Sequence, residues 1–342
     1  MRIGVICPSE IALRRFMPAL QQIEELEFAG LAVCTAEERF GQNPPAPAIV
    51  NATLEEEHRK AQVFIDTYGG KLFEGYGAIA ASNEIDALYI PLPPALHFRW
   101  AKEALSNGKH VLIEKPSTLA ASDTKALTEL AASGALALHE NYMFAFHDQL
   151  NAIQDLIADG EIGDVRLYRI SFGFPKRAGN DFRYDKALGG GALFDCGGYT
   201  IKYAGMLLGD TARILCAQSN HTDAFEVDVY GSATLVNDRG VTAQIAFGMD
   251  NSYKCDLEVW GSLGSLRSGR VLTAPAGFVP TVEITHGDAT ETRELPSDDA
   301  FAKSLKRFVQ CIHEPDVREE NYGILLRQSE MVDGFLKLAK GA

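Results

Sequence analysis

The sequence has few cysteines, no long apolar run and no clustered positive charge. Its six cysteines are scattered over 342 residues, with no CxxC pair and no cysteine–histidine spacing typical of metal sites. We therefore expect reduced, mostly buried thiols and no bound metal. No stretch approaches the roughly 18 apolar residues that span a bilayer, and residues 1–8 resemble a first strand more than a signal peptide. These features predict a cytoplasmic protein.

Acidic residues outnumber basic ones, 46 against 32, which gives a formal net charge of −14. No basic segment interrupts this balance, so neither nucleic acid nor an anionic membrane is an expected partner. A phosphate group would have to be bound by a locally built site. The chain is 46% hydrophobic and 23% charged, as in ordinary globular proteins, and its length is enough for two domains.

Residues 1–145 alternate strand and helix patterns. Short apolar runs that predict strands lie at 2–6, 28–34, 71–73, 85–90, 110–113 and 135–139, and helical periodicity lies at 11–23, 54–68, 96–105 and 120–132. This alternation predicts a doubly wound parallel sheet of the Rossmann type, which binds ligands beyond the carboxyl ends of its strands. Residues 36–53, with Gly41 and three prolines, are expected to form an inserted loop.

Residues 146–342 follow a different pattern, which predicts an α+β domain with an open, mainly antiparallel sheet. Strand-like runs lie at 165–174, 213–219, 225–236, 241–248, 254–260 and 279–285, and two of the links between them, at 237–240 and 261–264, carry turn signals. Helices are expected at 149–158, within 189–208, and at 298–313 and 321–339. Trp100 and Trp260 are expected in the core.

The first predicted strand does not feed the usual glycine-rich phosphate turn. A G-x-G-x-x-G/A pattern here would have glycine at positions 7 and 9 and glycine or alanine at position 12. The chain instead has Cys7 and Ser9, and only Ala12 fits the pattern. Small residues still allow a tight turn, and Ser9 can cap the following helix, whose N-terminus attracts phosphate. The segment is therefore either a modified phosphate turn or a strand–turn–helix with no ligand.

The second predicted strand ends at Thr35, where an NAD-preferring site usually carries an acidic residue. A neutral residue would not repel a 2′-phosphate, so we expect a weak preference for NADP(H) over NAD(H). Arg39 lies nearby and is either a phosphate ligand or a solvated surface residue.

Residues 85–116 strongly resemble the Gfo/Idh/MocA family of NAD(P)-dependent oxidoreductases. They read IDALYIPLPPALHFRWAKEALSNGKHVLIEKP, and the family signature is the Glu-Lys-Pro at 114–116. Further resemblance lies in the opening helix with Arg14 and Arg15, and in the segments at 139–149, 182–209 and 243–266. Within these, residues 182–195 and 253–262 are most similar to members that act on sugars, among them glucose–fructose oxidoreductase, dihydrodiol dehydrogenase and the C-3 ketoreductases of nucleotide-linked deoxysugars.

The resemblance implies a catalytic role for Lys115, Tyr199 and Asp195. Lys115 would polarise the substrate oxygen during hydride transfer, and Tyr199 would exchange a proton with it. Asp195 and Tyr199 are four residues apart, so they share a face if the segment is helical. The resemblance also implies a set of cofactor-binding residues, to which Lys115 itself belongs: Cys7, Pro8, Ser9, Glu10, Ile11, Thr35, Pro91, Leu92, Pro93, His97, Glu114, Pro116, Asn141, Arg183 and Tyr184.

The predicted function is hydride transfer between a nicotinamide cofactor, NADP(H) or NAD(H), and a sugar or nucleotide-sugar carbonyl or alcohol. Two alternatives remain: a non-catalytic NAD(P)-binding sensor or assembly protein, and a dehydrogenase of a non-sugar alcohol such as a dihydrodiol or inositol. The residues at 213–285 would leave one sheet face in water, which predicts a homodimer or homotetramer built on that face.

Overall fold

The computed structural model describes residues 1–179 and 181–340, and these form two compact units. Unit 1 comprises Met1–Thr118, Ser122–Asn141 and Ser304–Leu326. Unit 2 comprises Leu119–Ala121, Tyr142–Lys303 and Arg327–Ala342, of which the last two residues lie outside the described part. The division into domains 1–145 and 146–342 stays a prediction, and the chain returns to unit 1 after the strands of unit 2.

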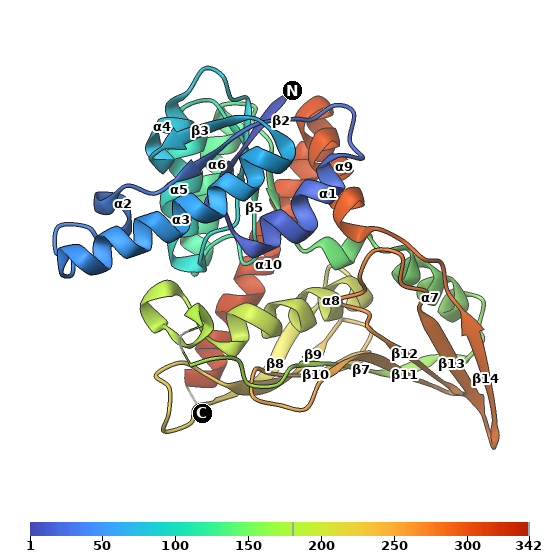
Figure 1. Cartoon of the computed structure of the whole chain (residues 1–342). Helices are drawn as coiled ribbons and strands as arrows, with labels where there is room; N and C mark the ends of the chain where they lie inside the picture. The colour runs from blue at the N-terminus through green and yellow to red at the C-terminus, as the bar shows by residue number, and fades with distance from the viewer. Residues whose placement is uncertain (180, 341–342) are drawn as a thin grey trace. The chain divides into compact units, whose positions relative to one another are not determined.

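Unit 1 is built on a six-stranded parallel sheet in the order β3-β2-β1-β4-β5-β6 (Figure 1). Its strands are β1 (Arg2–Ile6), β2 (Glu27–Val33), β3 (Lys71–Glu74), β4 (Ala87–Ile90), β5 (His110–Ile113) and β6 (Leu138–Glu140). The central strands are nearly continuous apolar runs because helices cover both faces of a parallel sheet. This arrangement confirms the predicted Rossmann fold.

The helices of unit 1 connect its strands and pack on them. A helical segment begins at Glu10, passes through a π-helical turn (Ala12–Phe16) and ends as α1 (Met17–Leu20). The others are α2 (Ala36–Phe40), α3 (Pro47–Tyr68), α4 (Tyr76–Ala81), α5 (Pro94–Ser106), α6 (Ala121–Ser133), most of α9 (Ala300–His313) and the first part of α10 (Pro315–Lys340). The sequence did not predict α4.

The expected inserted loop at 36–53 is largely wrong. Thr35 caps α2, because its hydroxyl accepts from the Glu38 N–H while the Glu38 carboxylate accepts from the Thr35 N–H. Pro47 lies in the first turn of α3, where its missing N–H breaks no helical bond, so α3 begins well before residue 54. The T-x-x-E pattern at 35–38 indicates the start of α2, and Pro47 indicates the start of α3. Both signals were overlooked because glycine and proline are also typical of loops.

Unit 2 contains an eight-stranded sheet in the order β14-β13-β12-β11-β7-β10-β9-β8. The strands are β7 (Val165–Gly173), β8 (Arg213–Asn220), β9 (Tyr230–Val236), β10 (Thr242–Gly248), β11 (Lys254–Gly261), β12 (Ser265–Gly269), β13 (Thr281–His286) and β14 (Ala289–Glu294). Neighbouring strands are antiparallel except for β7 and β10, which confirms the mainly antiparallel prediction. The sequence missed β12 and β14.

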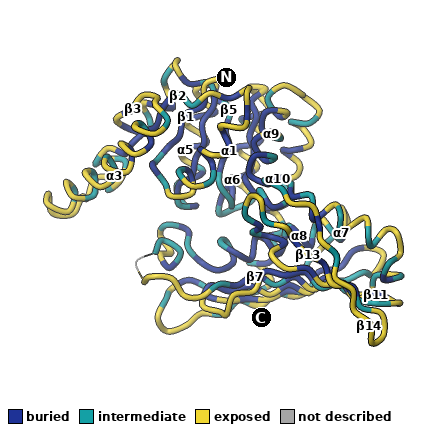
Figure 2. Tube along the Cα trace, turned by 45° about the vertical axis from the view of Figure 1, so that its right-hand side comes forward, coloured by how far each residue is buried: buried dark blue, intermediate teal, exposed yellow. Residues whose placement is uncertain are grey.

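One face of this sheet carries α8 (Gly198–Leu208), which packs on β7 and β10, and α7 (Asp148–Ala158) precedes β7. Figure 2 shows buried strands in both units and a largely exposed α3. Trp100 is 3% exposed, as expected, but Trp260 is 56% exposed on the other face of the sheet. Four of the six cysteines are buried and all six are free thiols. In the described chain, no helix combines the length and hydrophobicity that a membrane span requires.

Candidate active site

The cofactor residues predicted in unit 1, apart from His97, lie just beyond the carboxyl ends of its parallel strands. They follow β1, β2, β4, β5 and β6 as Cys7, Pro8, Ser9, Glu10, Ile11, Thr35, Pro91, Leu92, Pro93, Glu114, Lys115, Pro116 and Asn141. The strand order reverses between β1 and β4, and sheets of this kind bind their ligands at such a switch point. The structure thus brings these residues to one edge of the sheet.

The turn after β1 adopts the backbone of a glycine-rich loop without its glycines. Cys7 has a φ of 78°, the left-handed conformation that glycine adopts most readily. Ser9 Oγ accepts from the Ala12 N–H at 3.2 Å and so caps the helical segment that follows. Burial, together with the nearby carboxylate of Glu57, raises the pKa of the Cys7 thiol to about 12, so the side chain remains neutral. The turn therefore presents a helix N-terminus toward the sheet edge.

A carboxylate that was not predicted from the sequence accepts hydrogen bonds at the end of β2. Glu57, on α3, accepts from the Cys34 N–H and the Cys34 thiol, both at 2.9 Å, and from the Tyr76 hydroxyl at 2.8 Å. Burial raises the pKa of Cys34, and the bond to Glu57 adds to this, whereas the cation of Arg39 opposes it. Only the tertiary fold brings these side chains together, so no local pattern could have revealed them.

The acidic side chains near the end of β2 are engaged by the protein itself. Glu38 accepts from the backbone N–H groups of Thr35, Tyr76 and Gly77 at 2.9–3.0 Å, and Glu57 holds Cys34 as described. Thr35 is exposed and so is Arg39. This edge therefore offers a hydroxyl and a cation, with its carboxylates already hydrogen-bonded.

Glu114 and Lys115 directly follow β5. Glu114 Oε1 accepts from the Tyr89 hydroxyl and from Asn141 Nδ2, both at 2.7 Å. Burial raises the pKa of Glu114, while these two hydrogen bonds and the charge of Lys115 oppose the rise. The Lys115–Pro116 peptide bond is cis. Lys115 thus stands at a sheet edge beside a partly buried, hydrogen-bonded carboxyl group.

His97 is fully buried on α5 and joins two of these connections. Its Nδ1 lies 2.7 Å from the carbonyl oxygen of Pro116, and its Nε2 lies 2.7 Å from that of Leu92. Burial lowers the pKa of His97 to about 4 and outweighs the two carbonyl oxygens, which favour the cation. A neutral imidazole carries one N–H, so His97 donates to one of these two carbonyl oxygens and packs against the other, between the turns after β4 and β5.

We expect the free energy of unfolding to decrease as the pH falls from about 6.5 to about 4. Burial lowers the pKa of His97 and of His110 to about 4, so the unfolded chain, with an ordinary value near 6.5, takes up these protons first. The loss for His97 alone is roughly 1–3 kcal/mol. Urea unfolding of His97→Gln should show a shallower pH dependence, and His286→Gln, on exposed β13, is the control. An unchanged slope in His97→Gln would contradict the assignment.

In unit 2, the predicted residues Arg183 and Asp195 form a partly buried ion pair. Arg183 Nε donates to Asp195 Oδ2 at 2.6 Å, and its Nη1 donates to Asp181 Oδ1 at 3.1 Å. Three consecutive glycines, Gly189, Gly190 and Gly191, make this arrangement possible. A Cβ on Gly190 would lie 2.4 Å from the Arg183 carbonyl oxygen, and Gly191, at φ 121°, donates its N–H to that same oxygen. Of the three charged residues in this ion-pair cluster, Asp181 is the one that the sequence did not predict.

Tyr199 lies in the first turn of α8 within a cluster of aromatic rings. Its ring is 5.1 Å from Tyr142, 5.6 Å from Phe144 and 5.4 Å from Phe172, centre to centre. Asp195 lies in the π-helical turn Leu193–Gly197 that runs directly into α8. Tyr184 is buried, stacks on Phe225 and donates its hydroxyl to the Met249 carbonyl. These contacts give Tyr184 a structural role and fix the ring of Tyr199.

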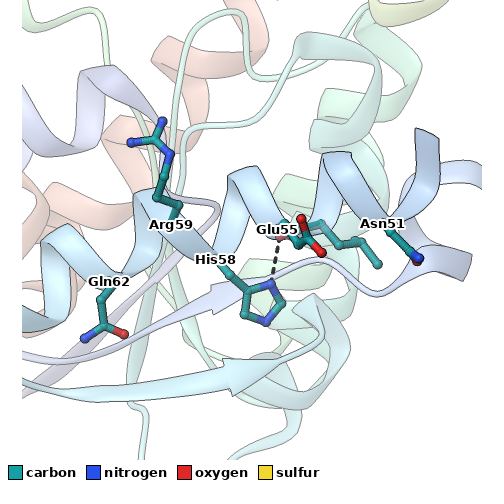
Figure 3. Close-up of a pocket in the computed structure, with 6 residues that line it drawn as sticks. Asn51, Glu55, His58, Arg59 and Gln62 are labelled. Atoms are coloured by element: carbon teal, nitrogen blue, oxygen red, sulfur yellow. Dashed lines mark hydrogen bonds between the residues drawn. The ribbon is translucent and has the colours of Figure 1, made fainter. Parts of the chain in front are cut away.

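The groove shown in Figure 3 is separate from all of these residues. It has a volume of about 520 Å³ and is lined from α3 alone, by Asn51, Leu54, Glu55, His58, Arg59 and Gln62. His58 Nδ1 lies 2.8 Å from the Leu54 carbonyl oxygen, one helical turn earlier. The groove is open surface along one helix and contains none of the predicted site residues.

Comparisons with known proteins agree with this arrangement. Residues 29–142 match the model of an oxidoreductase family with an NAD-binding Rossmann fold, and residues 150–267 match the GFO/IDH/MocA C-terminal domain. The chain is 38% identical to a dTDP-3,4-didehydro-2,6-dideoxy-alpha-D-glucose 3-reductase of Streptomyces violaceoruber, over 99% of this chain and 95% of that protein. It is 37% identical to the enzyme of the same name from Actinomadura kijaniata, over 97% and 94%.

A crystal structure of a 3-ketoreductase from Actinomadura kijaniata, in complex with NADP and TDP-benzene, has the same fold. The TM-score is 0.88 at 36% identity, over 99% of this chain and 97% of that one. The chain therefore belongs to the Gfo/Idh/MocA family of NAD(P)-dependent oxidoreductases. It is an enzyme that transfers hydride between the nicotinamide and a sugar or nucleotide-sugar carbonyl, which confirms the predicted class.

Proposed function

We propose that the chain is an NADPH-dependent 3-ketoreductase that reduces the C3 carbonyl of a dTDP-linked 2,6-dideoxyhexose. The observation that carries this proposal is the 38% identity to a 3-reductase of such a sugar across 99% of the chain. Lys115, which follows β5 in unit 1, and Asp195 and Tyr199 in unit 2 also support it. Reduction of a ketone needs hydrogen-bond and proton donors for the ketone oxygen, and these side chains can provide them.

The residues at the edge of the unit 1 sheet suit a dinucleotide. The left-handed Cys7 and the capped helix N-terminus after it would receive the pyrophosphate, and Thr35 with Arg39 would receive the adenosine ribose and its 2′-phosphate. Bound NADPH supplies a hydride to the substrate carbon. His97 holds the turns after β4 and β5 in place and does not itself need to contact the cofactor.

In this proposal, Lys115 donates a hydrogen bond to the substrate carbonyl oxygen and stabilises the negative charge that develops there. Tyr199 transfers the proton that converts this oxygen into a hydroxyl, and the tyrosinate is reprotonated from solvent. The 2.6 Å hydrogen bond from Arg183 fixes the position of the Asp195 carboxylate. The carboxylate, held in this way, orients the sugar. One hydride and one proton together complete the reduction.

The proposal is tested by adding a dTDP-linked 3,4-didehydro-2,6-dideoxyhexose, which has ketones at C3 and C4, to the purified protein and NADPH. Loss of NADPH fluorescence, with formation of one equivalent of the 3-hydroxy sugar, is the expected result. Tight NADPH binding without turnover on this or any other sugar would favour a non-catalytic sensor instead. Turnover on a dihydrodiol or inositol alone would favour the non-sugar alternative.

We expect at least tenfold tighter binding of NADPH than of NADH, a difference of about 1.4 kcal/mol. Arg39 is the exposed cation beside the end of β2, and Glu38 and Glu57 are both occupied by hydrogen bonds. Arg39→Ala should weaken NADPH binding by roughly tenfold and leave NADH unchanged, because only NADPH carries the 2′-phosphate. Arg59→Ala, an exposed arginine on α3, is the control in fluorescence titrations. Equal or tighter binding of NADH would contradict the preference.

We also propose that the face of the unit 2 sheet opposite α8 joins copies of this chain. It exposes Trp260 on β11, and a groove of about 620 Å³ lies over β7, β8, β9 and β10, with Ala246 exposed within it. Much of the face is polar, with Arg169 paired to Glu258 at 3.2 Å, so it is less apolar than the sequence suggested. Sedimentation should show a dimer or tetramer that Ala246→Glu disrupts and Ile49→Glu, on α3, does not. A monomer at micromolar concentration would contradict this.

A further inference from the structure

A continuous chain of hydrogen bonds runs through the interior of unit 1 and ends on the carboxylate next to Lys115. It connects side chains from α10, β6, α9 and the end of β5, in the order Asn321, His139, Ser304, Asn141 and Glu114. The four bonds measure 3.1, 3.0, 2.8 and 2.7 Å. Ser304 is fully buried, and His139, Asn141 and Asn321 are at most 3% exposed. Buried polar groups in such a network are costly unless every one is satisfied.

The chain has a direction, which the acceptor at its end determines. Glu114 Oε1 can only accept, so Asn141 must present its Nδ2 to it, and its Oδ1 then faces Ser304. That oxygen needs a donor, and the Ser304 hydroxyl supplies it at 2.8 Å. The amide of Asn141 is therefore held in one of its two orientations from both ends, by the Glu114 carboxylate and by the Ser304 hydroxyl.

Ser304 has only one hydroxyl hydrogen, and the bond to Asn141 uses it. The contact between Ser304 Oγ and His139 Nε2 must then be donated by the imidazole. On the other side of the ring, Asn321 Nδ2 donates to the Leu138 carbonyl at 2.6 Å, so Asn321 Oδ1 can only accept from His139 Nδ1, 3.1 Å away. Both ring nitrogens then donate, so this set of bonds requires the doubly protonated imidazole of His139. The helices α9 and α10, far along the sequence, thus orient the residue that follows β6.

We infer that Ser304 and His139 are positioning residues for the reduction, which act on Lys115 through Asn141 and Glu114. If the Ser304 hydroxyl is removed, Asn141 Oδ1 loses its donor, and the side chain of Asn141 can shift to find another one, which loosens its 2.7 Å bond to Glu114. Glu114 can then move, and Lys115, its neighbour in the chain, would move with it. This inference rests on the proposed role of Lys115, since a displaced donor matters only if it contacts the reacting oxygen.

Ser304→Ala should lower kcat by roughly tenfold, because small displacements of a catalytic group are costly in rate. The KM for the keto sugar and the Kd for NADPH should change by less than about threefold, and the isotope effect on kcat with 4-deuterated NADPH should increase, since hydride transfer becomes slower. Ser304→Thr retains the hydroxyl and should restore most of the rate. Ser268→Ala, which removes a buried hydroxyl from β12 of unit 2, is the matched control and should leave kcat unchanged.

The outcomes separate this inference from the proposed function. If Lys115→Ala is nearly inactive while Ser304→Ala keeps a normal kcat and isotope effect, the positioning role is wrong and the proposed function stands. If Lys115→Ala also keeps its activity, the catalytic assignment itself is wrong. If Ser304→Thr does not fold, ¹⁵N NMR of the unmodified protein decides: hydrogens on both ring nitrogens of His139 support the chain, and a bare Nε2 overturns it.

Discussion

Replacing Lys115 by alanine is expected to lower kcat by roughly 10²-fold or more, because loss of one preorganised donor costs about 2.7–4 kcal/mol. Lys115 follows directly after β5 and is next to Glu114, which Tyr89 and Asn141 hold at 2.7 Å. A donor anchored in this way loses little freedom when the substrate binds. The measurement is kcat for NADPH oxidation with a dTDP-linked 3-keto sugar, together with the Kd for NADPH.

Cofactor binding should change little in Lys115→Ala, because the dinucleotide would be bound mainly by the turn after β1 and the end of β2. Lys125→Ala, an exposed lysine on α6, controls for the loss of a positive charge. A near-normal kcat in Lys115→Ala would mean that another group polarises the carbonyl. A large loss of NADPH affinity with the remaining rate unchanged would make Lys115 a cofactor residue instead.

Tyr199→Phe is expected to lower kcat by roughly 10- to 10²-fold, less than the loss of Lys115, because water can partly replace a proton donor. The substitution keeps the ring, and with it the packing against Tyr142, Phe144 and Phe172. Stability should therefore be retained, so the rate reports on the hydroxyl alone. The measurement is kcat across a range of pH, with thermal unfolding as a check of the fold.

Tyr203→Phe provides a matched control one helical turn further along α8. Its ring is fully buried, and its hydroxyl has no hydrogen-bond partner among the described residues, so its removal should leave kcat unchanged and stability equal or higher. If both tyrosine variants keep their full rate, Tyr199 is a packing residue and the proton comes from another group.

The sequence predicted the unit 1 sheet well, because strands that are buried on both faces leave continuous apolar runs and their helices leave clear periodicity. Every predicted strand of that sheet is present, at times shifted by a few residues. The site residues at its edge followed from the Glu-Lys-Pro motif and its flanks. Local composition misled at 36–53, where glycine and prolines concealed the cap at Thr35 and the helix start at Pro47.

What the sequence could not reveal depends on contacts between distant segments. Glu57 reaches the end of β2 from α3, and Ser304 reaches Asn141 from α9, across 163 positions of the chain. Trp260 looked like a core residue, yet alternation along β11 places it on the exposed face of the sheet. In β14, no residue is buried, so no apolar pattern marked that strand.

The most direct test of the account is to follow the transferred hydrogen. The protein is incubated with NADPH that carries deuterium at the transferred position of C4 and with a dTDP-linked 3-keto-2,6-dideoxyhexose, and the product is examined by mass spectrometry and NMR. The account predicts one deuterium on C3 of the sugar and none at any other carbon. A reduced sugar with hydrogen from solvent at C3 would contradict it. So would the absence of NADPH consumption when this keto sugar is present.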